Sequence, residues 1–294
     1  MTSGFLLRQR TADLLNIFFL LLLTTLTAVF RQKVGNPALP ILLYSGLILI
    51  QVLLLLVKER GKFLRLFHAL IFPTISILLI FDSLEWLVHD INPRDIDPLL
   101  IKLDYMLFGG YPTVMLEGIM APLLTDLLQV AYFSYYFMPV SLGVILYRKG
   151  RTEELDRSLF FIMLCFYLSY VGYLLFPALG PRYTIAHLQS ADLGGLFLAG
   201  PLQNLLNSLE GVKRDAFPSG HTGVALTVLW LAWKYERKLG YVLAPASAAL
   251  IFSTVYCRYH YVIDVIGGIA LAVITLLTGE IFYGYRSQRI NSGR

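Results

Sequence analysis

Two short segments of this chain place two histidines and one carboxylate where apolar stretches begin. Residues 217–221 read Phe-Pro-Ser-Gly-His, and residues 260–264 read His-Tyr-Val-Ile-Asp. Ionisable side chains at a membrane helix cost free energy unless they are paired or used in function. The pattern therefore predicts a functional site that contains His221, His260 and Asp264.

The first segment is predicted to begin a helix, because Ser219 is a favoured N-cap residue and the apolar stretch 222–233 follows it. The first N–H groups of a helix have no partner within the helix, and together they form an anion site. We expect Ser219 and the backbone N–H of Gly220 to face such an anion beside His221.

The second segment pairs a base with a group that can orient it. His260 and Asp264 are four residues apart, so on a helix that continues past Leu271 they share one face. A carboxylate in this position holds an imidazole in one tautomer and leaves the other ring nitrogen free to attack.

Membrane helices are the elements that must position these residues. Hydrophobic residues make up 57% of the 294 residues, charged residues make up 15%, and the mean hydropathy is +0.67. This composition is typical of an integral membrane protein and excludes an ordinary soluble domain. Apolar runs long enough to cross a bilayer predict an all-α protein of about eight transmembrane helices, at residues 13–30, 38–57, 66–89, 121–147, 157–178, 219–235, 239–257 and 261–283.

The basic residues predict how these helices are oriented. Eight crossings put both termini on one side, which carries sixteen of the 24 lysines and arginines, Arg8, Lys58, Arg60 and Arg294 among them. The other side carries eight: Arg31, Lys33, Arg94, Lys102, Arg182, Lys213, Arg214 and Arg258. The positive-inside rule makes the first side cytoplasmic, so both histidine segments open to the opposite face. We expect a protein of the bacterial inner membrane with its site on the extracytoplasmic face.

Charge and cysteine content argue against several other classes. The net charge is +5, but the basic residues are dispersed over short turns, so no nucleic-acid partner is expected. Cys165 and Cys257 both lie in apolar stretches, and two buried thiols are expected there. The sequence has no glycine-rich phosphate loop, nucleotide motif or Cys/His metal pattern, so we expect no cofactor and no metal.

Two long connections, both on the extracytoplasmic side, contain further helical patterns. Apolar residues recur at helical spacing in residues 96–107 and again in residues 202–209. Such segments are typical of helices that lie in the membrane interface. They either roof a site that is entered sideways from the lipid or merely cover the ends of the bundle.

The two segments resemble motifs of the type 2 phosphatidic acid phosphatase superfamily. Residues 218–221, Pro-Ser-Gly-His, are similar to its second motif, and His260 with Asp264 is similar to the end of its third. The resemblance spans roughly residues 66–283. It implies N-terminal transmembrane helices at residues 1–65 and a phosphatase-like membrane domain, with a six-helix core, at residues 66–294.

The resemblance also implies a role for each matched residue. His260 would be the nucleophile that forms a phosphohistidine, Asp264 would orient it, and His221 would protonate the departing oxygen and later activate the acceptor. Ser219, the backbone N–H of Gly220 and nearby arginines would hold the phosphate oxygens. An ordinary histidine pKa of about 6.5 allows one imidazole to attack in neutral form while the other donates a proton.

The arginines depart from the family pattern. Arg182 follows Gly-Pro, but Leu175 stands seven residues before it, where the family has a lysine; Lys213 or Arg214 is the candidate replacement. In the third motif the family usually has its arginine at the position that Thr254 occupies here. The arginine of this chain is Arg258, which would lie one helical turn later. We expect both Arg182 and Arg258 to bind the phosphate. Residues 258–264, Arg-Tyr-His-Tyr-x-x-Asp, together with Gly-Pro-Arg at 180–182 are more similar to the branch with the inositol phosphorylceramide synthases than to the simple phosphatases. That branch passes a head-group phosphate to a lipid alcohol.

The remaining polar residues receive structural interpretations. Three histidines without a partner pattern are interpreted as packing or interface residues: His68, His89 and His187. Four aspartates whose spacing fits neither a calcium loop nor a zinc site are expected in a solvated loop: Asp90, Asp95, Asp97 and Asp104.

The sequence therefore predicts a membrane lipid phosphatase. It would cleave a phosphoester of a lipid-linked substrate, a lipid phosphate or lipid pyrophosphate, through a phosphohistidine and without a metal. One alternative is head-group phosphotransfer of the inositol phosphorylceramide synthase type, which differs only in whether water or a lipid alcohol resolves the adduct. The other is a non-enzymatic membrane transporter, which would carry inverted repeats and charges near mid-membrane.

Overall fold

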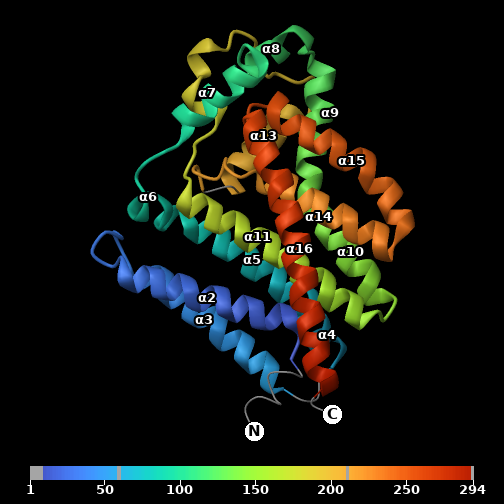
Figure 1. Cartoon of the computed structure of the whole chain (residues 1–294). Coiled ribbons are helices and arrows are strands. Elements are labelled where there is room, and N and C mark those ends of the chain that lie inside the picture. Colours follow the sequence, from blue (N-terminus) through green and yellow to red (C-terminus); the bar gives the residue numbers. More distant parts are fainter. Residues whose placement is uncertain (1–8, 58–60, 210–211, 293–294) are drawn as a thin grey trace.

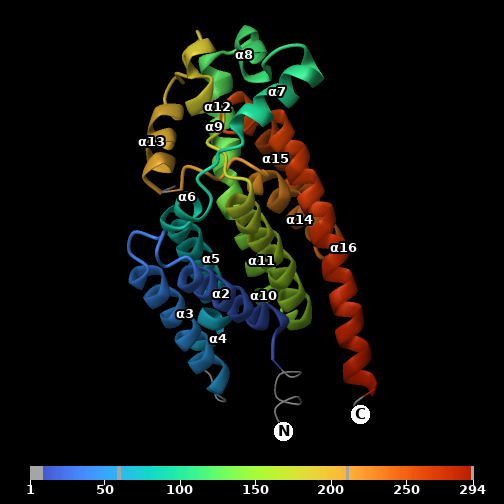
Figure 2. The same cartoon turned by 60° about the vertical axis from the view of Figure 1, so that its left-hand side comes forward.

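The computed structural model describes residues 9–57, 61–209 and 212–292. Arg8, Lys58, Arg60 and Arg294, which enter the prediction of orientation, lie outside these ranges. Within them the chain is helical and has no strand. The long helices form one bundle, and the short helices α7 (Asp97–Phe108) and α8 (Pro112–Met115) cover one end of it (Figures 1 and 2).

The bundle is built from stretches that match the predicted spans closely. In chain order they are α2 (Thr11–Val29), α3 (Ala38–Leu56), α4 (Lys62–Leu66) with η1 (Phe67–Ile71), α5 (Phe72–Ser83) and η2 (Leu84–Trp86), α9 (Pro122–Phe133) with η4 (Ser134–Tyr136) and α10 (Phe137–Arg148), α11 (Thr152–Leu175), α14 (Gly220–Tyr235), α15 (Arg237–Tyr256) and α16 (Val262–Ser292). The predicted all-α membrane fold is confirmed.

Seven of these stretches, counted over the described residues, are long and apolar enough to cross a membrane. The eighth predicted span is α14, which has 16 residues and is shorter than a typical crossing. Its first residues lie at the candidate site, so α14 begins inside the bundle.

The helix α11 lies at the centre of the bundle and packs against α2, α10, α14 and α16. Its side chains Phe161, Tyr167 and Tyr170 are buried, and Cys165 is a buried free thiol, as is Cys257. The thiols therefore agree with the prediction. Large apolar side chains on the outer helices remain exposed, as expected for surfaces that face lipid.

The two amphipathic connections form helices, α7 and α13 (Ala199–Leu209), as predicted. The expectation that Asp97 and Asp104 are solvated is wrong, because both side chains are buried. Asp104 accepts the backbone N–H groups of Val262 and Ile263 at 3.0 and 2.9 Å. The start of α16 needs acceptors for its unpaired N–H groups, and α7 supplies one.

Asp97 has the same function for a second loop. Its carboxylate accepts the backbone N–H groups of Leu179 and Gly180, both at 2.9 Å, and the Tyr261 hydroxyl at 3.0 Å. The helix α7 thus ties together the loop before α12 (Pro181–Thr184) and the loop before α16. These loops carry residues of the candidate site.

Candidate active site

The first histidine segment forms the start of α14, as predicted. The Ser219 hydroxyl caps the helix by accepting the backbone N–H of Thr222 at 3.3 Å. The backbone N–H of Ser219 donates to the Asp264 carbonyl at 3.0 Å, which ties the start of α14 to the first turn of α16. His221 therefore lies in the first turn of α14, next to the second segment.

Close helix packing holds this segment in place. A methyl group added at Gly268 on α16 would lie 2.5 Å from the Ser219 carbonyl oxygen, and one added at Gly172 on α11 would overlap the Pro218 ring. These two glycines let α11 and α16 approach the loop before α14 from both sides. The backbone around His221 is thus enclosed by its neighbours.

The second segment turns sharply between two helices. The helix α15 ends at Tyr256, and the Thr254 carbonyl accepts the backbone N–H groups of both Tyr259 and His260 at 2.9 Å. Arg258 has φ of 64°, in the left-handed region that side-chain-bearing residues rarely adopt. His260 precedes α16, whereas Asp264 lies in its first turn.

The predicted histidine–carboxylate pair forms even though the two residues do not share a helix. The Nδ1 atom of His260 lies 3.5 Å from Oδ2 of Asp264, and the same oxygen accepts the Tyr261 backbone N–H at 2.8 Å. Asp264 is fully buried and His260 is 3% exposed. The carboxylate therefore fixes both the loop and the ring that the loop carries.

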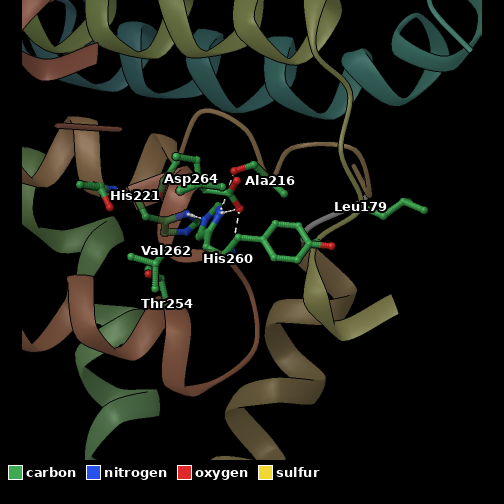
Figure 3. Close-up of polar contacts among 12 residues, drawn as sticks. Leu179, Ala216, His221, Thr254, His260, Val262 and Asp264 are labelled. Atoms are coloured by element: carbon green, nitrogen blue, oxygen red, sulfur yellow. Dashed lines mark hydrogen bonds and ion pairs between the residues drawn. The ribbon is translucent and has the colours of Figure 1, made fainter. Parts of the chain in front are cut away.

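The two imidazoles face each other across the site (Figure 3). The Nε2 atom of His260 lies 3.4 Å from Nδ1 of His221, and the ring centroids are 5.5 Å apart. The Nδ1 atom of His260 lies 2.8 Å from the Ala216 carbonyl oxygen. Because a carbonyl only accepts, Nδ1 of His260 donates, and the lone pair is on Nε2.

The surroundings keep His260 neutral. Burial lowers the pKa of His260 to about 4, and this effect outweighs the Asp215 carboxylate and the Ala216 carbonyl, which raise the pKa. Near pH 7 the ring is therefore a neutral base whose Nε2 points at His221. This is the protonation state that a nucleophile needs.

A polar cavity of about 390 Å³ adjoins both histidines. Arg182 and Lys213 supply positive charge to its wall, and Asp215 supplies a carboxylate. The Arg182 guanidinium lies 4.0 Å from the centroid of the Tyr259 ring, which holds the group in a stacked position. Two cations beside a neutral imidazole form a site suited to an anionic phosphoryl group.

Several predicted phosphate ligands do not line this cavity. Arg258 instead pairs with Glu117 at 2.9 Å and donates to the Ala191 carbonyl at 2.7 Å. The expected helical relation between residues 254 and 258 does not exist, because α15 ends at Tyr256. Arg214 is bound to Asp95 at 2.7 Å, so of the two candidate replacements Lys213 is the one in the cavity wall.

Ser219 and Gly220 are also absent from the residues that line this cavity. The Ser219 side chain is fully buried and serves as the helix cap. A methyl group added at Gly220 would overlap the Tyr173 hydroxyl, so only glycine fits there. Both residues shape the start of α14, which carries His221.

Asp215 and the aromatic residues around His221 were not predicted from the sequence. Asp215 lines the cavity with both histidines, and its signal was a lone carboxylate shortly before the Pro-Ser-Gly-His string. The Tyr132 ring stacks on His221 with centroids 4.5 Å apart, and the Tyr135 ring lies 4.3 Å from it. Aromatic residues in an apolar stretch cannot be told from core residues by sequence.

The described part of the chain brings together no group of three or more His, Cys, Asp or Glu side chains that could hold a metal ion. The positive charge of the candidate site comes from Arg182 and Lys213.

Comparisons with known proteins agree with the motifs. A family model described as the PAP2 superfamily matches residues 99–278. A PA-phosphatase related-family protein of Dictyostelium discoideum is 24% identical over 186 residues, which cover 56% of this chain and 34% of that protein. An inositol phosphorylceramide synthase of Candida albicans is 28% identical over 221 residues, which cover 68% of this chain and 45% of that protein. The chain thus spans less than half the length of either relative, and no solved structure matches it.

Proposed function

Because the chain belongs to the PAP2 superfamily, which its motifs predicted, we propose that it cleaves a phosphoester of a lipid-linked substrate through a phosphohistidine on His260. It is an integral membrane protein and a lipid phosphoester hydrolase or phosphotransferase. One observation carries the proposed mechanism. The neutral Nε2 of His260 faces His221 at the wall of a cavity that also holds Arg182 and Lys213.

The reaction proceeds in two balanced steps. In the first, the lone pair on Nε2 of His260 attacks phosphorus and the bond to the leaving oxygen breaks. His221 gives that oxygen a proton, which the ring takes up when the anionic phosphoryl group enters beside it. In the second, His221 takes a proton from the acceptor, whose oxygen attacks phosphorus as the N–P bond breaks. The phosphoryl group enters between the two rings and replaces their 3.4 Å contact.

The other site residues position the reacting groups. Arg182 and Lys213 hold the phosphoryl oxygens, and Asp264 keeps Nδ1 of His260 protonated through its contact at 3.5 Å. Ser219 and Gly220 fix the start of α14 and hence His221. Arg258 acts at a distance, because its ion pair with Glu117 anchors the loop that carries His260.

The reaction needs no metal in this proposal. Phosphoryl transfer depends on positioning and on neutralising charge at the equatorial oxygens, and in many enzymes a metal contributes this charge. Here Arg182 and Lys213 contribute it. We expect turnover to be unchanged by a chelator, whereas restoration of lost activity by added magnesium would contradict the metal-free mechanism.

Water is the first acceptor that we propose, which makes the protein a lipid phosphatase. A specific observation also favours phosphotransfer to a lipid alcohol, because a second cavity, with an apolar wall, reaches His221 and Asp215. The relative named as an inositol phosphorylceramide synthase supports the same alternative. Comparison of the products formed with and without an added lipid alcohol identifies the acceptor.

The covalent step can be tested directly. The purified protein is mixed with a lipid phosphate carrying a labelled phosphoryl group and quenched in alkali. A phosphohistidine survives in alkali and is hydrolysed in acid, so an acid-treated sample should lose the label. We expect label on the wild type and on His187→Ala, whose side chain is exposed on η5 (Ala186–Leu188). The variant His260→Ala should carry none, and an equally labelled His260→Ala protein would overturn the proposal.

We also propose that the site faces away from the cytoplasm, as the basic residues predicted. Cysteine substitutions at exposed positions test this, because both native cysteines are buried. A membrane-impermeant maleimide added to intact cells should label Ser190→Cys near the site and leave Lys149→Cys, at the end of α10, unlabelled. The reverse result would invert the orientation. The bacterial inner membrane stays a prediction, since the two relatives come from eukaryotes.

A further inference from the structure

A second cavity, of about 310 Å³, also reaches Asp215 and His221, but its wall is apolar. Its wall is apolar and comes from three helices, with Leu78 and Phe81 on α5, Val140 on α10, and Ile162 and Phe166 on α11. At one end it is lined by Asp215 and His221, which also line the polar cavity. The site therefore has two compartments that meet at these residues.

The two compartments differ in charge. The apolar cavity is lined by two carboxylates, Asp82 and Asp215, and by neither lysine nor arginine. The polar cavity is lined by two cations, Arg182 and Lys213, and shares the Asp215 carboxylate, so its cations outnumber its carboxylates. A phosphate is attracted by the cations and repelled by the carboxylates, so charge assigns the phosphoryl group to the polar cavity. The apolar cavity is suited to a neutral head group that donates hydrogen bonds.

The apolar cavity is accessible from the side of the bundle. Leu78 on α5 is 46% exposed and Val140 on α10 is 42% exposed, and both belong to its wall. Both residues lie in stretches long and apolar enough to span a membrane, so this exposed surface faces lipid. A volume of about 310 Å³ lies at the lower end of the range for small-molecule sites, and its apolar wall fits a hydrocarbon chain.

We propose that the apolar cavity binds the acceptor, a neutral lipid alcohol that enters from the bilayer between α5 and α10. This inference rests on the phosphotransfer form of the proposed function, and it names the binding site of the second substrate. The hydroxyl group lies at His221 and Asp215, and the chain lies along Leu78, Phe81 and Val140. The phosphoryl group, carried by His260, lies between the two imidazoles at the edge of the polar cavity, where the hydroxyl at His221 can reach phosphorus.

The arrangement explains why His221 lines both compartments. His221 is 9% exposed, and its Nε2 atom has no hydrogen-bond partner among the described residues. In the transfer step the proton of the lipid hydroxyl passes to His221, the new P–O bond forms, and the N–P bond to His260 breaks. Asp215 accepts a hydrogen bond from the entering head group and so positions it. His260 lines only the polar cavity, which places the donor phosphoryl group there.

A cavity-filling variant with a matched control tests the assignment. Val140→Trp fills the mouth of the cavity, whereas Val144→Trp adds the same bulk one turn along α10, at a residue that is 37% exposed and outside the cavity wall. Adduct formation from labelled dioctanoyl phosphatidic acid and transfer of the label to a short-chain ceramide, whose phosphorylated product differs from the donor, are measured separately. We expect Val140→Trp to lower transfer at least tenfold more than it lowers adduct formation, and Val144→Trp to change neither.

The other outcomes count against the proposal. If Val140→Trp slows adduct formation as much as transfer, the cavity holds the chains of the donor lipid instead. If transfer is unchanged, the cavity is not the acceptor site. Failure of the wild type to form any adduct would contradict the proposed function, and a binding measurement then decides the present inference independently.

The binding measurement uses a photoreactive diacylglycerol in vesicles of zwitterionic phospholipid. It should label peptides of α5 and α10 in the wild type and equally in His260→Ala. Competition is measured in His260→Ala, which cannot convert phosphatidic acid into diacylglycerol; there dioctanoylglycerol should compete whereas dioctanoyl phosphatidic acid should not. When Asp82→Asn is added to His260→Ala, one of the two repelling charges is lost, so phosphatidic acid should become a competitor. Labelling elsewhere, or equal competition by both lipids in His260→Ala, would overturn the proposal.

Discussion

The described part of the chain holds two buried pairs of a histidine and an aspartate. His68 and Asp13 pair among the N-terminal helices, with Nε2 and Oδ2 3.0 Å apart. His260 and Asp264 pair between α15 and α16, with Nδ1 and Oδ2 3.5 Å apart. By residue type and burial the two pairs are alike, yet their surroundings differ.

The first pair belongs to a network of polar side chains that satisfy one another. Asp13 accepts the Gln51 amide at 2.9 Å, and Gln51 accepts the Asn16 amide at 2.7 Å. Asn16 in turn accepts the hydroxyls of Ser76 and Tyr167 at 2.9 and 2.5 Å. This network joins α2, α3, α5 and α11, and neither of the two cavities reaches it.

The second pair leaves one ring nitrogen for chemistry. Nδ1 of His260 is held by Asp264 and Ala216, while Nε2 points at His221 and into a cavity lined by two cations. The comparison teaches that a buried histidine–carboxylate pair is not by itself a site. It becomes one when the free nitrogen faces a space that holds a substrate of matching charge.

The largest expected difference between the two pairs is in turnover. His260→Ala removes the proposed nucleophile and should lower turnover by about 10⁴-fold or more, as expected for loss of a covalent catalyst. His68→Ala should retain turnover within about threefold, because the N-terminal pair contributes to stability only. Phosphate release and lipid products are measured with both purified variants. Near-normal turnover in His260→Ala would remove the distinction between the pairs.

The aspartates of the two pairs should differ in their effect on kcat. Asp264→Asn keeps the shape but loses the charge that holds Nδ1 of His260, so kcat should fall by about 10²- to 10⁴-fold with KM nearly unchanged. Asp13→Asn should leave kcat within about threefold of the wild type. An equal rise in KM for Asp264→Asn would indicate that this carboxylate acts on binding and not on the nucleophile.

Binding of the anionic substrate should depend on Arg182 and not on Arg214. Arg182→Gln removes a cation from the polar cavity and should raise KM for a lipid phosphate by about 10- to 100-fold, the worth of a charge-assisted hydrogen bond. Arg214→Gln breaks only the pair with Asp95 and should change KM little. Steady-state kinetics in mixed micelles measure both. Equal effects would mean that the phosphate is held outside the described cavity.

The pH dependence should reveal the lowered pKa of His260. The neutral ring attacks, so kcat/KM should fall by about tenfold per pH unit only below the His260 pKa of about 4. Because this pKa lies below the ordinary value of 6.5, His260 binds fewer protons folded than unfolded. Its contribution to stability is present above pH 6.5 and is lost as the pH falls towards about 4. An acid limb near 6.5 would contradict this environment.

The smallest effect on turnover is expected where the effect on stability is largest. His68→Gln removes the imidazole that lies 3.0 Å from Oδ2 of Asp13, while Gln51 still donates to Oδ1. The change should cost about 3 kcal/mol of stability, as for a broken buried pair. Thermal unfolding in detergent measures this loss, and turnover well below the midpoint should be close to that of the wild type. A large loss of turnover with no change in the midpoint would assign the N-terminal pair to the reaction.

Features that depend on residues close in sequence were predicted, whereas features that depend on residues far apart in sequence were not. Hydropathy predicted each long helix, with most ends within a few residues, because any long apolar stretch must bury its backbone in helical hydrogen bonds within a membrane. The N-cap at Ser219 and the pairing of His260 with Asp264 were also predicted, since both depend on residues close in sequence. The burial of Asp97 and Asp104 was missed, because their partners lie some eighty or more residues away.

Sequence alone therefore determined the membrane setting, the family and the histidine–aspartate pair, since these depend on composition and local spacing. Only the tertiary structure decided which cations face His221 and His260. Arg182 and Lys213 line the cavity, while Arg258 and Arg214 are bound to carboxylates from distant segments. A long basic side chain can reach several partners, and its direction is set by the backbone at its own position and by the charges that folding brings near it.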